Sequence, residues 1–105
     1  MFARVSTYEG PAGRIDEAVA AFDDDDRLLE LEGLEDAFLL VDRRGGRMIT
    51  ITLWADEAAL VATAPAADDI RAAGAGAGGQ VVTAVEAYEV ALHARPDIEA
   101  RRARA

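Results

Sequence analysis

A pair of alternating segments joined by two glycines constrains the fold of this chain most strongly. Residues 47–54, RMITITLW, alternate aliphatic side chains with threonines and the only tryptophan of the sequence, which is the pattern of a β-strand with two different faces. The segment EDAFLLVD, residues 35–42, precedes it, and the sequence RRGG separates the two. Adjacent glycines permit the positive φ values of a tight turn. The sequence therefore predicts a β-hairpin over residues 35–54.

The segments before the hairpin predict one strand and one helix. Residues 2–9, FARVSTYE, alternate and stop at Gly10-Pro11, as a strand does before a turn. From Arg14 onward apolar residues recur at helical spacing until the four aspartates of residues 23–26 interrupt them. A calcium loop would need a glycine and a terminal glutamate that are not in place here. We therefore interpret the acidic run as a solvated or loosened helical segment.

The segments after the hairpin predict a second helix and a last strand. Asp56 is the expected N-cap of an alanine-rich helix, and Pro65 should interrupt that helix and open a second helical piece. The GAGAGG run of residues 74–79 matches a nucleotide-binding pattern in its letters, but it follows a helix and precedes a strand, which is the reverse of that motif. We expect a flexible loop there. Residues 80–92, QVVTAVEAYEVAL, complete the pattern as a strand.

The order of these elements is β-α-β-β-α-β. It predicts an α+β, ferredoxin-like fold in which both helices cover one face of a four-stranded antiparallel sheet. We expect one domain over residues 1–92, which suits a chain of 105 residues, and a polar C-terminal tail over residues 93–105.

Charge and composition exclude several classes of function. The formal net charge is -9, from 20 acidic and 11 basic residues, so phosphate backbones should be repelled and no nucleic-acid partner is expected. The sequence contains no cysteine, and no run of apolar residues is long enough to span a bilayer. We expect no metal site, no membrane association and a cytoplasmic location.

Both faces of the predicted sheet carry apolar residues. We take Ile49, Ile51 and Leu53 as the set that faces the helices, with Ala3 and Val5 beside them on the first strand. The other face then holds large residues instead of the polar ones that a solvated sheet face should have. These residues are Phe2, Tyr8, Met48 and Trp54. Because exposed apolar patches usually mark interfaces, we expect a homodimer in which one sheet faces the other.

The block LEGLEDAFLLVDRRGGRMITITLWADEAAL, the ending VEAYEV and the order of the elements together resemble the dimeric α+β barrel superfamily. The similarity extends over residues 1–92 and is greatest to the antibiotic biosynthesis monooxygenase-like domains. That superfamily includes cofactor-free monooxygenases, haem-degrading enzymes, muconolactone-type isomerases and chlorite dismutase-type enzymes, so the fold alone does not settle the function.

The resemblance also indicates what is missing from this chain. Members that oxidise aromatic polyketides or degrade haem commonly use an asparagine, a tryptophan and a histidine in the cavity. This sequence has no asparagine, and its only histidine, His93, follows the last strand. Trp54 matches a tryptophan that is widespread at this strand end. We therefore expect no histidine-ligated haem and no other cofactor.

Eight side chains of the strands are candidates for a site, either between the sheet and its partner or in the cleft beside the helices. As catalytic residues we assign Arg4 to a developing anion, and Ser6 and Glu86 to proton transfer. The remaining candidates would bind the substrate; they are Tyr8, Thr50, Thr52, Trp54 and Tyr88. The aromatic members of this set could equally be plain packing residues of a core or an interface.

Two functions follow from this site. One is a cofactor-independent, monooxygenase-like enzyme that acts on a flat aromatic or quinol-like substrate. The other is a non-catalytic dimeric module that binds a hydrophobic ligand or a partner, or serves a stress-related role. The missing asparagine and the position of His93 favour the second function.

Overall fold

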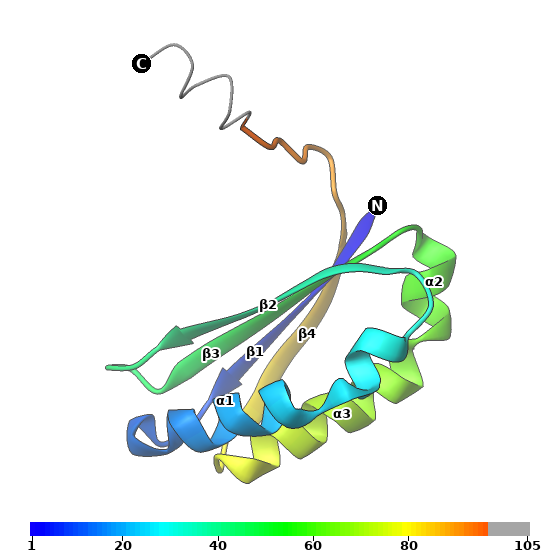
Figure 1. The fold of residues 1–105 in the computed structure, drawn as a ribbon. Helices are drawn as coiled ribbons and strands as arrows, with labels where there is room; N and C mark the ends of the chain where they lie inside the picture. Colours follow the sequence, from blue (N-terminus) through cyan, green and yellow to red (C-terminus); the bar gives the residue numbers. More distant parts are fainter. Residues whose placement is uncertain (97–105) are drawn as a thin grey trace.

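The computed structural model describes residues 1–96 and has a single antiparallel sheet with helices on one face (Figure 1). The sheet order is β2-β3-β1-β4. Its strands are β1 (Phe2–Glu9), β2 (Leu34–Asp42), β3 (Arg47–Trp54) and β4 (Val81–Glu89). The helices are α1 (Ile15–Asp24), α2 (Glu57–Ala62) and α3 (Ala64–Ala77), with short 3-10 helices η1 (Ala12–Arg14) and η2 (Asp26–Glu30). The predicted ferredoxin-like fold is confirmed.

The C-terminal tail is only partly described. Of its arginines, Arg95 is exposed, whereas Arg101, Arg102 and Arg104 lie outside the described residues. The boundary that we predict at residue 92 therefore stays a prediction. No helix of the described part is both long enough and apolar enough to cross a bilayer.

The hairpin turn forms where the sequence predicts it. The Asp42 side chain accepts hydrogen bonds from the backbone N–H groups of Arg44 (3.1 Å) and Gly45 (3.0 Å). Gly46 follows with φ at +70°, and a Cβ atom there would collide with the carbonyl oxygen of Gly10. Only glycine meets both requirements, so this residue sets the geometry of the turn.

The helices after β3 begin as the sequence indicates but end later. The Asp56 carboxylate caps α2 by accepting from the Ala59 backbone N–H at 2.8 Å, and Pro65 lies in the first turn of α3. The loop that we expect over residues 74–79 is wrong, because α3 continues to Ala77. Its glycines allow α3 to approach α1 so closely that the ring of Phe22 lies directly over Gly74. Tertiary packing overrides the low helix propensity of glycine.

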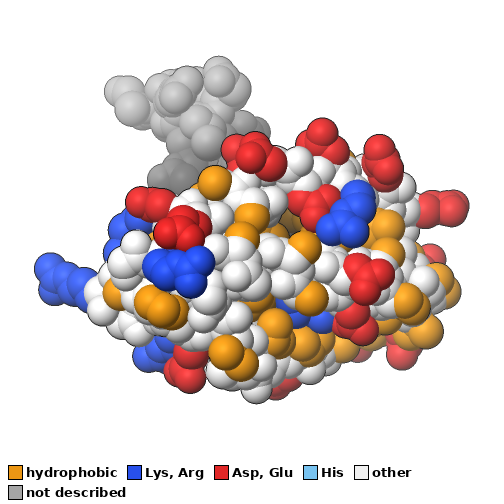
Figure 2. Space-filling view, turned by 90° about the horizontal axis from the view of Figure 1, so that it is seen from below, with side chains coloured by type: hydrophobic (Ala, Val, Ile, Leu, Met, Phe, Trp, Pro, Cys, Tyr) orange, Lys and Arg blue, Asp and Glu red, His pale blue; other side chains and the backbone are white. Residues whose placement is uncertain are grey.

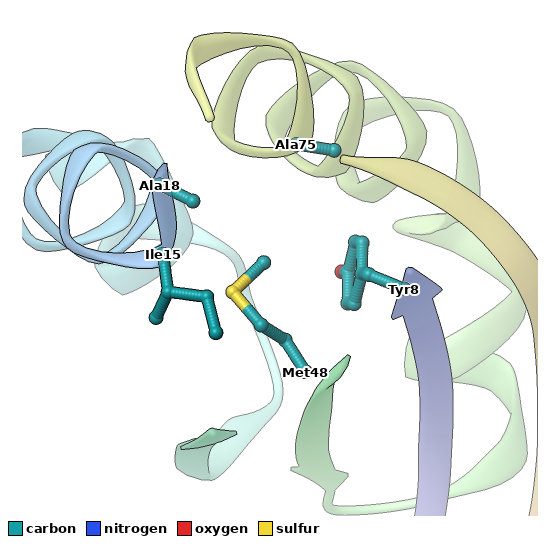
Figure 3. Packing of buried hydrophobic residues seen from close by; sticks show 5 residues of the cluster. All are labelled: Tyr8, Ile15, Ala18, Met48 and Ala75. Atoms are coloured by element: carbon teal, nitrogen blue, oxygen red, sulfur yellow. The ribbon is translucent and has the colours of Figure 1, made fainter. Parts of the chain in front are cut away.

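The core lies between the sheet and the pair α1 and α3. Its buried cluster is shown in Figure 3 and consists of Tyr8, Ile15, Ala18, Met48 and Ala75. In that view Tyr8 and Met48 extend from their strands toward the two helices. The ring of Tyr8 also meets that of Phe22 edge to face, with 5.8 Å between the centroids.

The face that we predict to meet the helices is the wrong one. Tyr8 and Trp54 are fully buried on the helix side, whereas Ile49, Ile51 and Leu53 lie on the opposite side and are only partly buried. Alternation divides a strand into two sets, but it does not say which set meets the core. Here the polar members of the inner set are hydrogen-bonded to one another or to the helices, which makes their burial tolerable.

The outer face of the sheet is apolar and open. Cross-strand pairing aligns Val5 with Ile51 and Ile51 with Phe38, and the neighbouring row aligns Ile49 with Leu40. In the single chain Phe38 and Leu40 are about half exposed, at 47% and 48%. The apolar surface that we expect on the sheet face away from the helices therefore exists, although different residues form it.

Candidate functional site

A cavity of about 680 Å³ separates the inner face of the sheet from the helices. Its floor is polar and comes from β1 and β3, with Arg4, Ser6, Thr50 and Thr52, while α3 adds Arg71. Its walls are mostly apolar and include Val19, Phe22, Leu28, Leu39, Ala67 and Ile70. Small-molecule sites typically measure about 300 to 1,000 Å³ and combine apolar walls with a few polar groups, so this cavity has the size and the lining of one.

Two separate side-chain hydrogen bonds orient the floor of the cavity. The Tyr8 hydroxyl and the Thr50 hydroxyl lie 2.8 Å apart, and the Trp54 indole N–H donates to the Thr52 Oγ1 at 2.9 Å. Tyr8 and Trp54 do not line the cavity themselves. They hold the two threonines in one orientation. Burial raises the pKa of Tyr8, and its hydrogen bond with Thr50 offsets part of this rise.

Arg4 is buried with one side of its guanidinium unsatisfied. Its Nη2 donates to the Leu60 carbonyl oxygen at 2.5 Å, and its Cζ lies 5.3 Å from the centre of the Trp54 ring. Its Nη1 is buried and has no hydrogen-bond partner among the described residues. Burial lowers the pKa of Arg4 and nearby Arg71 lowers it further, whereas Asp68 acts in the opposite direction.

Arg71 enters the same cavity from α3. Its Nε donates to the Ser6 Oγ at 3.0 Å, and its Nη1 donates to the Asp68 carboxylate at 2.5 Å. The side chain of Arg71 is 8% exposed, whereas that of Asp68 is 67% exposed. The cavity thus holds two buried guanidinium groups, and the solvated Asp68 carboxylate is bonded to that of Arg71.

The predicted site residues separate onto two faces of the sheet. Six of them share the inner face, namely Arg4, Ser6, Tyr8, Thr50, Thr52 and Trp54. Glu86 and Tyr88 pair with Val5 and Ala3, so they lie on the outer face, where the Tyr88 hydroxyl donates to Glu86. The structure therefore divides the eight predicted residues between two faces, and neither Glu86 nor Tyr88 reaches the cavity that holds Arg4.

Sequence comparison finds no relative, whereas structure comparison finds several. No protein-family model matches the chain, and no curated protein matches it. A MhuD mutant with two manganese protoporphyrin IX molecules bound per active site superposes with a TM-score of 0.66 at 23% identity, over 91% of this chain and 100% of that one. A Deinococcus radiodurans protein described as an antibiotic biosynthesis monooxygenase superposes with a TM-score of 0.63 at 16% identity, over 91% of this chain and 98% of that one. This chain has the antibiotic biosynthesis monooxygenase-like fold.

A third solved structure of this fold is that of SnoaB, a cofactor-independent oxygenase from Streptomyces nogalater. It superposes with a TM-score of 0.54 at 17% identity, over 91% of this chain and 97% of SnoaB. All three matches cover nearly the whole described domain at low identity. They confirm the fold that the sequence resemblance implies, while the chemistry has to be inferred from the residues of this chain.

The porphyrin in one of these structures raises the question of whether this cavity suits a haem. Its lining contains no histidine, cysteine or methionine, and His93 is exposed beyond β4. The side chains of Arg4 and Arg71 occupy the floor instead. Axial ligation of haem iron needs one of those donors or a tyrosinate, and the buried Tyr8 is hydrogen-bonded to Thr50 and does not line the cavity. The residues of this cavity do not fit a ligated haem.

Sequence reasoning missed Arg71, although a signal for it existed. Ala67, Arg71 and Gly74 are spaced by four and three residues, which places all three on one face of a helix. The same face carries Ile70 and meets the core. A lone arginine on the apolar face of an alanine-rich helix is unusual enough to be read as a site residue.

Proposed function

We propose that this chain is a cofactor-independent, oxygenase-like enzyme that binds a flat aromatic or quinol-like molecule in the cavity between sheet and helices. The observation that carries the proposal is buried Arg4, which lines that cavity and whose Nη1 has no hydrogen-bond partner among the described residues. A preorganised cation in a site shielded from water stabilises negative charge that develops on a substrate oxygen.

In such a reaction the substrate itself reduces oxygen. An ionised aromatic hydroxyl delivers electrons to O₂, and a carbon–oxygen bond forms. The oxygen–oxygen bond then breaks while the same carbon loses its hydrogen to solvent as a proton, so that one oxygen atom becomes a carbonyl of the product and the other leaves as water. Arg4 would hold the ionised hydroxyl, and Ser6, which accepts from Arg71, would pass a proton to the departing oxygen. Glu86 has no part in this scheme because it lies on the outer face.

We also infer that a second copy of the chain covers the outer face of the sheet. The apolar rows through Val5, Ile51 and Phe38 and through Ile49 and Leu40 form a patch of the kind that monomeric proteins rarely expose. Two such faces packed against each other form an isologous interface with closed symmetry. Glu86 and Tyr88 would then lie at that interface instead of in the cavity.

A specific observation favours the alternative, a non-catalytic ligand-binding module. Three carboxylates line the cavity, and they belong to Asp23, Asp25 and Asp26. Asp23 and Asp26 are exposed, and Asp25 is paired with Arg27 at 2.6 Å. Within residues 1–96 the lining therefore offers no buried carboxylate or histidine as a general base. The substrate would have to arrive ionised or lose its proton to solvent.

Oxygen uptake separates the two functions. We expect native protein to consume oxygen with naphthohydroquinone in excess of the spontaneous rate, and Arg4→Ala to lower that rate about 100-fold, as the loss of one oxyanion donor does elsewhere. Arg47→Gln, which removes an equal charge at the far end of β3, should leave the rate unchanged. A naphthohydroquinone that binds without any enzyme-dependent uptake would support the binding module.

A further inference from the structure

The two buried arginines also indicate what the ligand must carry. Arg4 and Ser6 are neighbours on the inner face of β1, about 7 Å apart along the strand. Arg71 reaches Ser6 from α3, and its charge is close enough to lower the pKa of Arg4. Both line the cavity, and both are more than nine-tenths buried.

The charge at this end of the cavity is not balanced. Asp68 is the one carboxylate that raises the pKa of Arg4, and it is solvated and already bonded to Arg71. Three aspartates also line the cavity, but Asp23 and Asp26 are exposed and Asp25 is paired with Arg27, so among the described residues no buried carboxylate faces the two buried guanidinium groups. Burying a charge without a partner is costly, and a buried donor without an acceptor adds to that cost. An anionic oxygen at Arg4 Nη1 would relieve both.

We propose that this end of the cavity is an anion site, in which Arg4 and Arg71 bind a carboxylate or an ionised hydroxyl of an aromatic ligand. The inference rests on the proposed function for the aromatic part, since Phe22, Leu39 and Ile70 provide the apolar walls. It adds Arg71 as a second cation for the anionic oxygen and extends the acidic group from an ionised hydroxyl to a carboxylate. A neutral aromatic of the same shape would leave Nη1 unsatisfied, and a site built around a polar contact discriminates strongly against an analogue that lacks it.

Calorimetric titration of the native chain with three probes tests this site without requiring turnover. Naphthoate supplies a carboxylate, hydroxynaphthoquinone supplies a hydroxyl that is ionised at neutral pH, and naphthamide is a neutral isostere of naphthoate. We expect at least one of the anions to bind about ten to a hundred times more tightly than naphthamide, because hydrogen bonds to charged groups are the strong ones. The anion that binds more tightly identifies the acidic group. Equal affinities for all three, or no binding of either anion, would overturn the proposal.

Variants of the two arginines test whether these side chains produce the preference for an anion. Arg71→Gln and Arg4→Gln should abolish the preference for the anion, whereas Arg47→Gln, which removes the same charge outside this cavity, should retain it. If either buried arginine proves necessary for folding, Asp68→Asn provides an independent test, because Asp68 is exposed and competes for Arg71 Nη1. Its removal should tighten anion binding about two- to fivefold and leave naphthamide unaffected. Weaker anion binding in Asp68→Asn would contradict the site. Because binding is measured directly, these results stand even if no oxygen is consumed.

Discussion

Two glycines of α3 provide the sharpest test of how this fold is packed. A Cβ atom at Gly74 would lie 2.5 Å from Cε1 and 2.6 Å from Cε2 of Phe22, much closer than a van der Waals contact. A Cβ atom at Gly76, two residues along the same helix, would have nothing within 4 Å. The same substitution, glycine to alanine, therefore probes packing at one position and helix propensity alone at the other.

The free energy of unfolding should change in opposite directions. Alanine in place of glycine in a helix gains up to about 1 kcal/mol from propensity, so Gly76→Ala should stabilise the chain by about 0.5 to 1 kcal/mol. Overpacking a tight contact costs about 1 to 3 kcal/mol. When the gain in helix propensity is subtracted from this cost, Gly74→Ala should lower the free energy of unfolding by up to about 2 kcal/mol. The ring of Phe22 can move only toward the cavity that it lines, and this movement would break its edge-to-face contact with Tyr8. The two variants should differ by about 1 to 3 kcal/mol.

Urea denaturation measures this difference, and the protein concentration is held fixed because the proposed dimer would make unfolding depend on concentration. A second readout comes from the cavity, which Phe22 lines: displacement of the ring by Gly74→Ala should weaken ligand binding, and Gly76→Ala should not affect it. Equal stability of the two variants, or a more stable Gly74→Ala, would refute the close approach of α1 and α3 described here.

Two further predictions concern the sheet. Ile51→Glu places a charge at the centre of the outer face, so we expect sedimentation to show monomers for this variant and dimers for the native chain. Val61→Glu on exposed α2 should remain dimeric, and a native chain that sediments as a stable monomer would contradict the inferred interface. Burial holds the pKa of Tyr8 above its ordinary value of 10.0, so the folded state favours the protonated phenol. The stability that follows from this preference is fully present below about pH 10 and is lost as the pH rises through the pKa of the folded state. The free energy of unfolding should therefore fall less steeply above about pH 10 in Tyr8→Phe than in native protein, and parallel curves would rule out this assignment.

The candidate site shows how far sequence reasoning reaches. Arg4, Ser6, Thr50 and Thr52 could be proposed because strand alternation groups them on one face, and the structure does place them in one cavity. Glu86 and Tyr88 could not be separated from them, because that depends on the pairing of β4 with β1 and on the register shift between Thr7 and Tyr8. Such pairing joins segments that lie far apart in the chain, and no local pattern encodes it.

Local rules account for the elements of this fold. The period of two along residues 47–54, the glycines before them and the cap at Asp56 act within a few residues, so the order of strands and helices can be read directly from the chain. Tertiary packing decides the orientation of the sheet and the composition of the cavity. Arg4 finds its acceptor 56 residues away, at Leu60, and Arg71 finds Ser6 at a separation of 65. Contacts of this kind make it favourable to bury the mixed face and leave the aliphatic face open, because hydrogen bonds to distant partners compensate the desolvation of polar groups.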